Sequence, residues 1–142
     1  MELFSDTQPD LLLFDADADN ETLYGSVVDM QDYENVAFFC CVQKGEAATF
    51  SLKVQQGETS NLSDAADLAG TAKSIVIATG TDGFAFAEVK NPKERYVRPA
   101  LVCPNVGTAK VVAIFAIRYG AKYLPETNSD GELNVAPAEG TA

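Results

Sequence analysis

The chain of 142 residues carries 21 acidic and 10 basic side chains and no histidine, so its formal net charge is −11. A length of this order is typical of one domain that can bury a sizeable core without disulfides or metals. The negative charge disfavours nucleic acid as a partner, because phosphates would be repelled, and no apolar run approaches the roughly 20 residues that cross a bilayer.

Residues 1–21 are acidic and show neither a helical period nor a strand alternation. They contain one compact apolar cluster of Leu11, Leu12, Leu13 and Phe14. Each of these side chains can contribute about 1.5–3 kcal/mol when buried, so the cluster could pair with a sheet edge or pack on a partner. We predict that residues 1–21 are an N-terminal arm whose removal leaves the melting transition nearly unchanged.

Strand-like segments separated by turn signals follow between residues 22 and 120. The segment 36–43 is apolar on both faces and is predicted to be central, whereas 49–55 alternates as expected of a strand with one wet face. The other strand segments are 23–30, 74–79, 84–89, 94–103 and 110–120. About seven strands without βα units predict an all-β antiparallel β-sandwich of Greek-key or jelly-roll type over residues 22–120.

Four local features refine this prediction. Residues 110–120 are apolar on both faces for most of their length, which predicts a strand in the middle of the sandwich that is covered on each side. Pro99 lies inside its strand and predicts an edge position or a bulge. Residues 63–68 could form one or two helical turns capped by Ser63. Residues 121–142 lose all pattern and are predicted to be an extended or disordered C-terminal tail.

The three cysteines, Cys40, Cys41 and Cys103, all lie in apolar strand-like runs. They are predicted to be buried free thiols, which is typical of assembly in a reducing cytoplasm. A catalytic thiol would need a base to form its thiolate, and the sequence has no histidine to supply one. We therefore predict that the protein is not an enzyme.

The acidic run 15–19 resembles the start of a calcium loop. An EF-hand would require Gly at the sixth position and Glu at the twelfth, where this sequence has Asn20 and Ser26. A solvated acidic linker is favoured over a weak cation site, and no cofactor or metal is predicted.

Arg95 and Arg98 lie three residues apart and would project to opposite faces of a strand. One could pair with an acidic residue on a neighbouring strand, while the other could contact a partner.

The succession of short strands, the start Arg95-Tyr96-Val97-Arg98 of one strand, the closing strand 111–119 and the patternless tail resemble a known family. These features resemble the small cement, or decoration, proteins that tailed bacteriophages place on the outside of their capsids. The resemblance covers roughly residues 23–120. It implies a jelly-roll-like sandwich with terminal arms that binds the major capsid protein and reinforces the expanded shell.

The same resemblance implies that the protein belongs to the virion, on the capsid exterior, after assembly in the host cytoplasm. It also implies a homo-oligomer, either a dimer or a trimer, with no nucleic acid or membrane partner. The residues predicted to contact the capsid are Leu11, Leu12, Leu13, Phe14, Arg95, Arg98, Tyr123 and Leu124. The alternative is a carbohydrate- or receptor-binding sandwich of a tail or fibre, which predicts an exposed aromatic cluster and is weakened by the lack of tryptophan.

Overall fold

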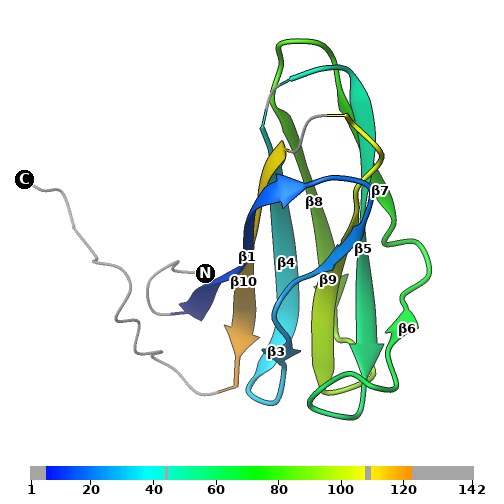
Figure 1. The fold of residues 1–142 in the computed structure, drawn as a ribbon. Helices are drawn as coiled ribbons and strands as arrows, with labels where there is room; N and C mark the ends of the chain where they lie inside the picture. The colour runs from blue at the N-terminus through cyan, green and yellow to red at the C-terminus, as the bar shows by residue number, and fades with distance from the viewer. Residues whose placement is uncertain (1–5, 44, 108–109, 123–142) are drawn as a thin grey trace, which may run out of the picture.

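The computed structural model describes residues 6–43, 45–107 and 110–122, which form two antiparallel β-sheets packed face to face (Figure 1). Sheet A has the strand order β1-β10-β4-β8, and sheet B has the order β2-β9-β5-β6, with β3 also paired to β9 and β7 to β5. Sheet A consists of β1 (Thr7–Ala18), β4 (Tyr33–Val42), β8 (Gly83–Lys90) and β10 (Lys110–Ala121). Sheet B consists of β2 (Thr22–Tyr24), β3 (Val28–Asp29), β5 (Ala48–Gly57), β6 (Ala66–Asp67), β7 (Lys73–Ile77) and β9 (Tyr96–Val102).

The strand pairings are nested along the chain. β1 pairs with β10, β2 and β3 with β9, β4 with β8, and β5 with β7. The chain is thus one long hairpin folded over on itself, and the pairs β10–β4 and β9–β5 close it. This is a jelly roll, so the predicted all-β antiparallel sandwich is confirmed. The described residues form ten strands instead of about seven, because residues 7–18 form β1, β6 was not expected and the segment 23–30 divides into β2 and β3.

The core lies between the two sheets and is built from the apolar alternation of their strands. The largest fully buried side chains include Phe38, Phe50, Leu52, Ile77, Leu101 and Ile114. In β5 the predicted alternation is confirmed, since Phe50, Leu52 and Val54 are buried while Ser51 and Lys53 are only half-buried. The predicted central position of segment 36–43 is also confirmed, because β4 lies between β10 and β8.

The structure replaces the expected N-terminal arm with a strand, so of the two alternatives for the cluster 11–14 the pairing with a sheet edge is confirmed. Residues 7–18 form β1, an edge strand of sheet A that pairs with β10 along its length. Leu12 and Ala18 are buried in the core, at 8% and 0% exposure. Two register shifts, between Leu11 and Leu13 and between Asp15 and Ala18, break the two-residue period by which a strand is recognised. Residues 1–5 lie outside the described residues.

An ion pair also ties β1 to β10. The Arg118 Nη2 donates to the Asp10 carboxylate at 3.0 Å, and its Nη1 donates to the carbonyl of Asp29 at 3.1 Å. The guanidinium lies 4.7 Å from the ring centroid of Tyr33. The N-terminal strand is therefore held by side chains as well as by the sheet ladder.

Pro99 does not lie in an edge strand, but it lies opposite a register shift, so the prediction is confirmed in part. Tyr24 pairs with Ala100 and Val28 with Val97, so the three residues 25–27 stand opposite only two residues of β9. β9 has β2 and β3 on one side and β5 on the other. The carbonyl of Pro99 accepts a hydrogen bond from the Gly25 nitrogen at 3.0 Å, so its ring nitrogen faces the gap between β2 and β3. A missing N–H costs nothing there, because no strand continues the ladder in that gap.

Residues 63–68 form turns and the short strand β6 instead of the expected helical turns. Asp64, and not Ser63, binds the backbone of this loop: its carboxylate accepts from the nitrogens of Glu58 at 2.8 Å and Thr59 at 3.3 Å. The expected C-terminal tail lies outside the described residues from residue 123 onward, while Ala121 still belongs to β10.

The placement of β1 predicts opposite responses at two adjacent leucines. Leu12→Ala should lower the free energy of unfolding by about 2–5 kcal/mol, because it leaves a cavity in the core. Leu11→Ala should change it by no more than about 0.5 kcal/mol, because Leu11 is 70% exposed. Urea unfolding followed by circular dichroism measures both, and equal effects would contradict the assignment of β1 to the sheet.

Candidate functional site

The outer face of sheet A, the side turned away from sheet B, carries three consecutive rows of side chains that are apolar except for Glu88 at one corner. Each row takes one residue from β1, β10, β4 and β8 in turn, as the strand registers place them opposite one another. The first row is Leu11, Phe115, Phe39 and Phe86. The second is Phe14, Ala113, Cys41 and Phe84. The third is Pro9, Ile117, Ala37 and Glu88. Cross-strand neighbours of this kind stand about 4.5–5.5 Å apart, so the rows form one continuous surface.

Phe39 lies at the centre of this outer face. Its ring centroid is 5.0 Å from that of Phe115, with 9° between the planes. The corresponding distances are 5.9 Å to Phe86 and 6.3 Å to Phe84. Aromatic rings at such separations attract one another beyond their simple burial. The cluster is therefore ordered by its own contacts before anything binds to it.

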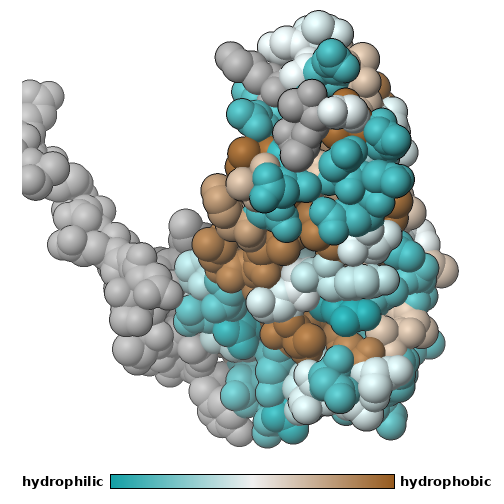
Figure 2. Space-filling model, in the orientation of Figure 1, coloured by the Kyte–Doolittle hydropathy of each residue, from teal (hydrophilic) through white to brown (hydrophobic). Residues whose placement is uncertain are grey.

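Several side chains of the outer face remain largely exposed. The exposed fractions are 70% for Leu11, 67% for Phe14, 59% for Phe84 and 58% for Phe86. Figure 2 shows hydrophobic residues gathered on the left flank of the molecule, where Figure 1 places β1 and β10. Contiguous exposed apolar patches on a protein surface mark sites of interaction.

The expectation that residues 110–120 are covered on each side is corrected by this arrangement. The inner residues of β10, such as Val112 and Ile114, are fully buried against sheet B. The outer residues Ala113, Phe115 and Ile117 are only half-buried by their neighbours within sheet A. The two-sided apolar pattern therefore combines a core face with a surface that the described residues leave open.

Polar groups border the outer face at one end. The Tyr119 hydroxyl donates a short hydrogen bond to the Glu88 carboxylate across β4. Burial, followed by this contact with a carboxylate, raises the pKa of Tyr119 to about 12. The phenol therefore stays protonated at neutral pH and keeps the Glu88 side chain in place at the rim.

One cysteine belongs to the outer face, which corrects the prediction that all three are buried. Cys40 and Cys103 are buried, whereas Cys41 is exposed. Burial raises the pKa of the Cys40 thiol to about 12 and that of Cys103 to about 11. Neighbours in a strand point to opposite faces, so Cys41 lies beside Phe84 while Cys40 points into the core.

The structure divides the leucine cluster between the two faces of β1. Leu11 and Phe14 lie on the outer face and belong to the candidate site. Leu12 is buried and Leu13 packs partly against the core, so neither is available to a partner. Tyr123 and Leu124 lie outside the described residues.

The two predicted arginines make structural contacts. Arg95 donates from Nε and Nη2 to the two carboxylate oxygens of Asp29, at 2.9 and 2.7 Å. This guanidinium contact lowers the pKa of Asp29. Arg98 donates to the Gln55 side chain at 2.9 Å and lies 4.3 Å from the ring centroid of Tyr24. An acidic partner was expected for one arginine and is found for Arg95, and neither residue lies on the outer face.

Phe39, Phe86 and Phe115 were not predicted as site residues, because phenylalanines in strands are expected in the core. The available signal was the apolar character of both faces of segments 36–43 and 110–120. In the acidic run 15–19, Asp19 has a structural role, since it accepts a hydrogen bond from the Val106 nitrogen at 2.8 Å. Within the described ranges no three metal-ligating side chains gather, and no helix is long and apolar enough to cross a membrane.

Comparison with known proteins identifies the fold. No family model and no curated protein matches the chain. Among solved structures, the PBSX exported protein XepA is similar at 14% sequence identity and a TM-score of 0.56, over 93% of this chain and 44% of that one. The chain thus spans less than half of the XepA chain. At this identity the likeness shows the fold alone.

Two further structures match less well. One is a Bacillus endospore appendage described as a disulfide-linked pilus, at 17% identity and a TM-score of 0.46, over 81% of this chain and 88% of that one. The other comes from the infectious bursal disease virus Gx strain, at 12% identity and a TM-score of 0.45, over 84% of this chain and 34% of that one.

The outer face predicts that the three thiols differ in reactivity. In the native protein a maleimide should label Cys41 rapidly, because its side chain is exposed. Cys40 and Cys103 should react only after unfolding, because their thiols are buried and remain protonated. Peptide mapping by mass spectrometry measures this, and native labelling of Cys40 at the rate of Cys41 would contradict the register of β4.

Proposed function

We propose that this protein is a structural component of a virus particle, which binds the exterior of the assembled capsid and stabilises it through the outer face of sheet A. The partner is the major capsid protein. The observation that supports this most is the apolar surface of three rows, with Phe39 stacked at its centre. A surface of this kind binds by burial of apolar area and requires no reactive group.

The size of the outer face suggests how such binding would work. Four strands about 4.8 Å apart and three rows about 6.8 Å apart give a footprint of roughly 400 Å². Both partners together would then bury roughly 800 Å², which lies below the range of about 1,200–2,000 Å² that is typical of specific interfaces. One such contact is weak, but several in a dimer or trimer would be retained strongly through multivalency. We therefore propose that the protein is a dimer or trimer on the shell, so that several weak contacts act together.

The sequence resemblance to phage cement proteins agrees with this proposal, and the jelly-roll fold shared with XepA is compatible with it. The location that follows is the capsid exterior, reached after assembly in the host cytoplasm. Catalysis has no part in the proposal.

A carbohydrate- or receptor-binding role is the second candidate, and one observation favours it: Phe14, Phe84 and Phe86 form an exposed aromatic surface. Sugar rings stack on aromatic faces, but their hydroxyls also need hydrogen-bond partners nearby. The three rows offer mainly the Glu88 carboxylate, which already accepts from Tyr119. This chemistry fits an apolar protein surface better than a glycan.

Co-sedimentation with expanded capsid shells that lack this protein tests the proposal. The wild-type protein should sediment with the shells at micromolar concentration. Phe86→Asp and Phe14→Asp should each reduce the bound fraction at least about tenfold, because a carboxylate would be desolvated in the contact. The matched control is Val76→Asp, which adds the same charge at a 73% exposed apolar side chain of sheet B.

Two results would count against this function. Wild-type protein that stays in the supernatant would remove the capsid as partner. Equal loss of binding in Phe86→Asp and Val76→Asp would show that added charge, and not the outer face, controls attachment. Binding to a glycan array that Phe86→Asp abolishes would favour the second candidate.

A further inference from the structure

The two edges of sheet A differ in how well they are protected against further strand pairing. The β1 edge carries Pro9 and two register shifts, features by which natural proteins prevent unwanted strand pairing. The β8 edge, Gly83–Lys90, alternates buried and exposed residues without interruption and pairs with β4 without a register shift. Within the described ranges no strand pairs with the open side of β8. A regular edge of this kind is a template for another strand.

The hydrogen-bond alternation shows which backbone groups this edge offers. The Asn91 nitrogen donates to the Glu34 carbonyl at 2.8 Å. Continuing that alternation along the β4–β8 register makes the odd-numbered residues of β8 the ones that bond to β4. The N–H and C=O groups of the even-numbered residues therefore point to the open side. Two of these residues, Phe84 and Phe86, also carry exposed rings of the outer face.

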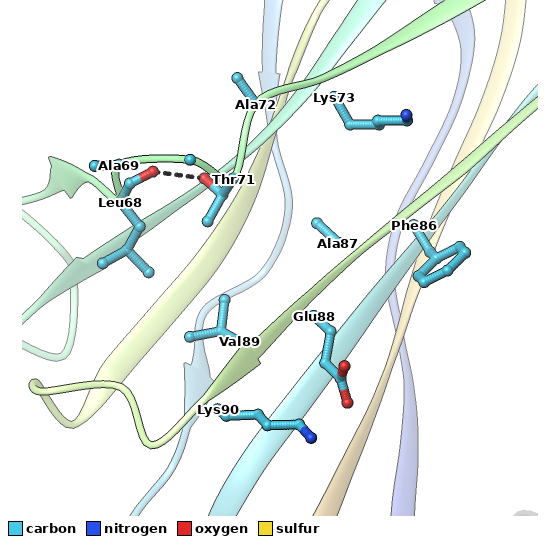
Figure 3. Close-up of a pocket in the computed structure, with 11 residues that line it drawn as sticks. Leu68, Ala69, Thr71, Ala72, Lys73, Phe86, Ala87, Glu88, Val89 and Lys90 are labelled. Atoms are coloured by element: carbon cyan, nitrogen blue, oxygen red, sulfur yellow. Dashed lines mark hydrogen bonds between the residues drawn. The ribbon is translucent and has the colours of Figure 1, made fainter.

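A hollow of about 380 Å³ runs along the inner side of this edge, between β8 and residues 68–73. Figure 3 shows Ala87 and Val89 of β8 directed toward it, on the opposite side of the strand from Phe86 and Glu88. A strand added to the edge would place its own inner side chains beside this hollow. Mostly small inner residues suit that position, and the inner residues of β8 itself are Gly83, Ala85, Ala87 and Val89.

We propose that the β8 strands of two copies of this chain pair antiparallel across a two-fold axis, which joins their four-stranded A sheets into one continuous sheet. The use of the dimer rests on the proposed function, since this contact would form the oligomer on the shell, but the pairing itself does not require a shell. Edge pairing of this kind is isologous and closes with two copies. It therefore selects a dimer over a trimer.

The charges at the two ends of β8 select one register for this pairing. Antiparallel pairing through the outward groups matches even-numbered residues with one another. A two-fold axis at Phe86 places Glu88 opposite Phe84 of the second copy, and Lys90 opposite Asp82. Both members of this last pair are exposed, and Lys90 forms no ion pair with any residue that the structure describes. The two symmetry-related pairs of Lys90 with Asp82 thus give each edge its electrostatic complement in a second copy.

Neighbouring registers fit less well. An axis at Ala87 places Lys90 opposite Phe84 and forms no charge pair. An axis at Glu88 brings two carboxylates together, which is unfavourable across a sheet. An axis at Val89 pairs Glu88 with Lys90 but engages only the last residues of the strand, since β8 ends at Lys90. The register centred on residue 86 pairs opposite charges and engages the whole strand.

The same register extends the outer face across the axis. Phe86 lies opposite its counterpart, so the stacked rings of Phe115, Phe39 and Phe86 continue into the second copy. Two footprints of roughly 400 Å² then form one of roughly 800 Å². Contact with a protein partner would bury roughly 1,600 Å² in total, which lies within the range of specific interfaces. The dimer therefore supplies the contact area that a single outer face lacks.

Sedimentation equilibrium and residue-resolved hydrogen exchange, both on the full chain without shells, test the proposal. The protein should form a dimer with a Kd below about 100 µM. The amides of Phe84, Phe86 and Glu88 should exchange at least about tenfold more slowly in the dimer than at concentrations where the monomer prevails. The amides of Ala87 and Val89 bond to β4 and should be protected at both concentrations, which verifies folding.

An exchange of charges tests the register. Lys90→Asp and Asp82→Lys should each raise the dimer Kd at least about threefold, because each places like charges opposite one another twice. The double variant restores opposite charges and should return the Kd to within about twofold of the wild-type value. The matched control Lys93→Asp makes the same charge change at an exposed residue outside the paired strand and should leave the Kd within that margin.

Three outcomes would overturn the proposal. One is a protein that stays monomeric at about 100 µM. Another is a dimer in which the amides of Phe84, Phe86 and Glu88 exchange freely, because it would use a different surface. The third is a double variant that dimerises as weakly as the single variants. A monomer that still sediments with shells would contradict the dimer alone, whereas a dimer that stays in the supernatant would contradict capsid binding alone.

Discussion

The antiparallel pairing of β4 with β10 is the interaction on which the rest of the structure depends. Both strands are apolar on both faces, but a two-layered sandwich covers only one of them. On the inner face Phe38 and Ile114 are fully buried. On the outer face Phe39 and Phe115 stack at 5.0 Å with their rings nearly parallel. One ladder therefore builds the core and the candidate binding surface together.

The nested hairpin topology extends that surface. β1 and β8 flank the central pair and continue its rows, so that Leu11 and Phe86 lie in line with Phe115 and Phe39. Strands from distant parts of the sequence thus contribute to one continuous face. An apolar face without a central charge suits a protein partner whose own contact surface is apolar at its centre.

Much of the fold could be predicted from the sequence, because period-two patterns in segments such as 49–55 identify strands and their buried side. The strand β1 could not be predicted in this way, because its two register shifts interrupt the alternation of buried and exposed residues. For Pro99 the edge alternative was wrong and the bulge alternative agrees with the register shift opposite it, but the sequence does not reveal that the shift lies in the neighbouring segment 25–27. Both difficulties arise from how strands pair with one another, and not from the chemistry of the residues involved.

The candidate site was harder to predict for a related reason. A strand that is apolar on both faces has the same sequence whether its second face meets its own chain or a partner. The same ambiguity applies to Cys41, which the sequence could not distinguish from Cys40. Leu11 and Phe14 were predicted to contact a partner as part of an arm; they are exposed, but on a strand of the sheet.

A side-chain-resolution image of the intact particle would show which face of the sandwich meets the shell. We expect Phe39, Phe86 and Phe115 to be in contact with the major capsid protein, with sheet B turned toward solvent. A particle in which the outer face of sheet A points to solvent, or one that lacks this protein altogether, would contradict it.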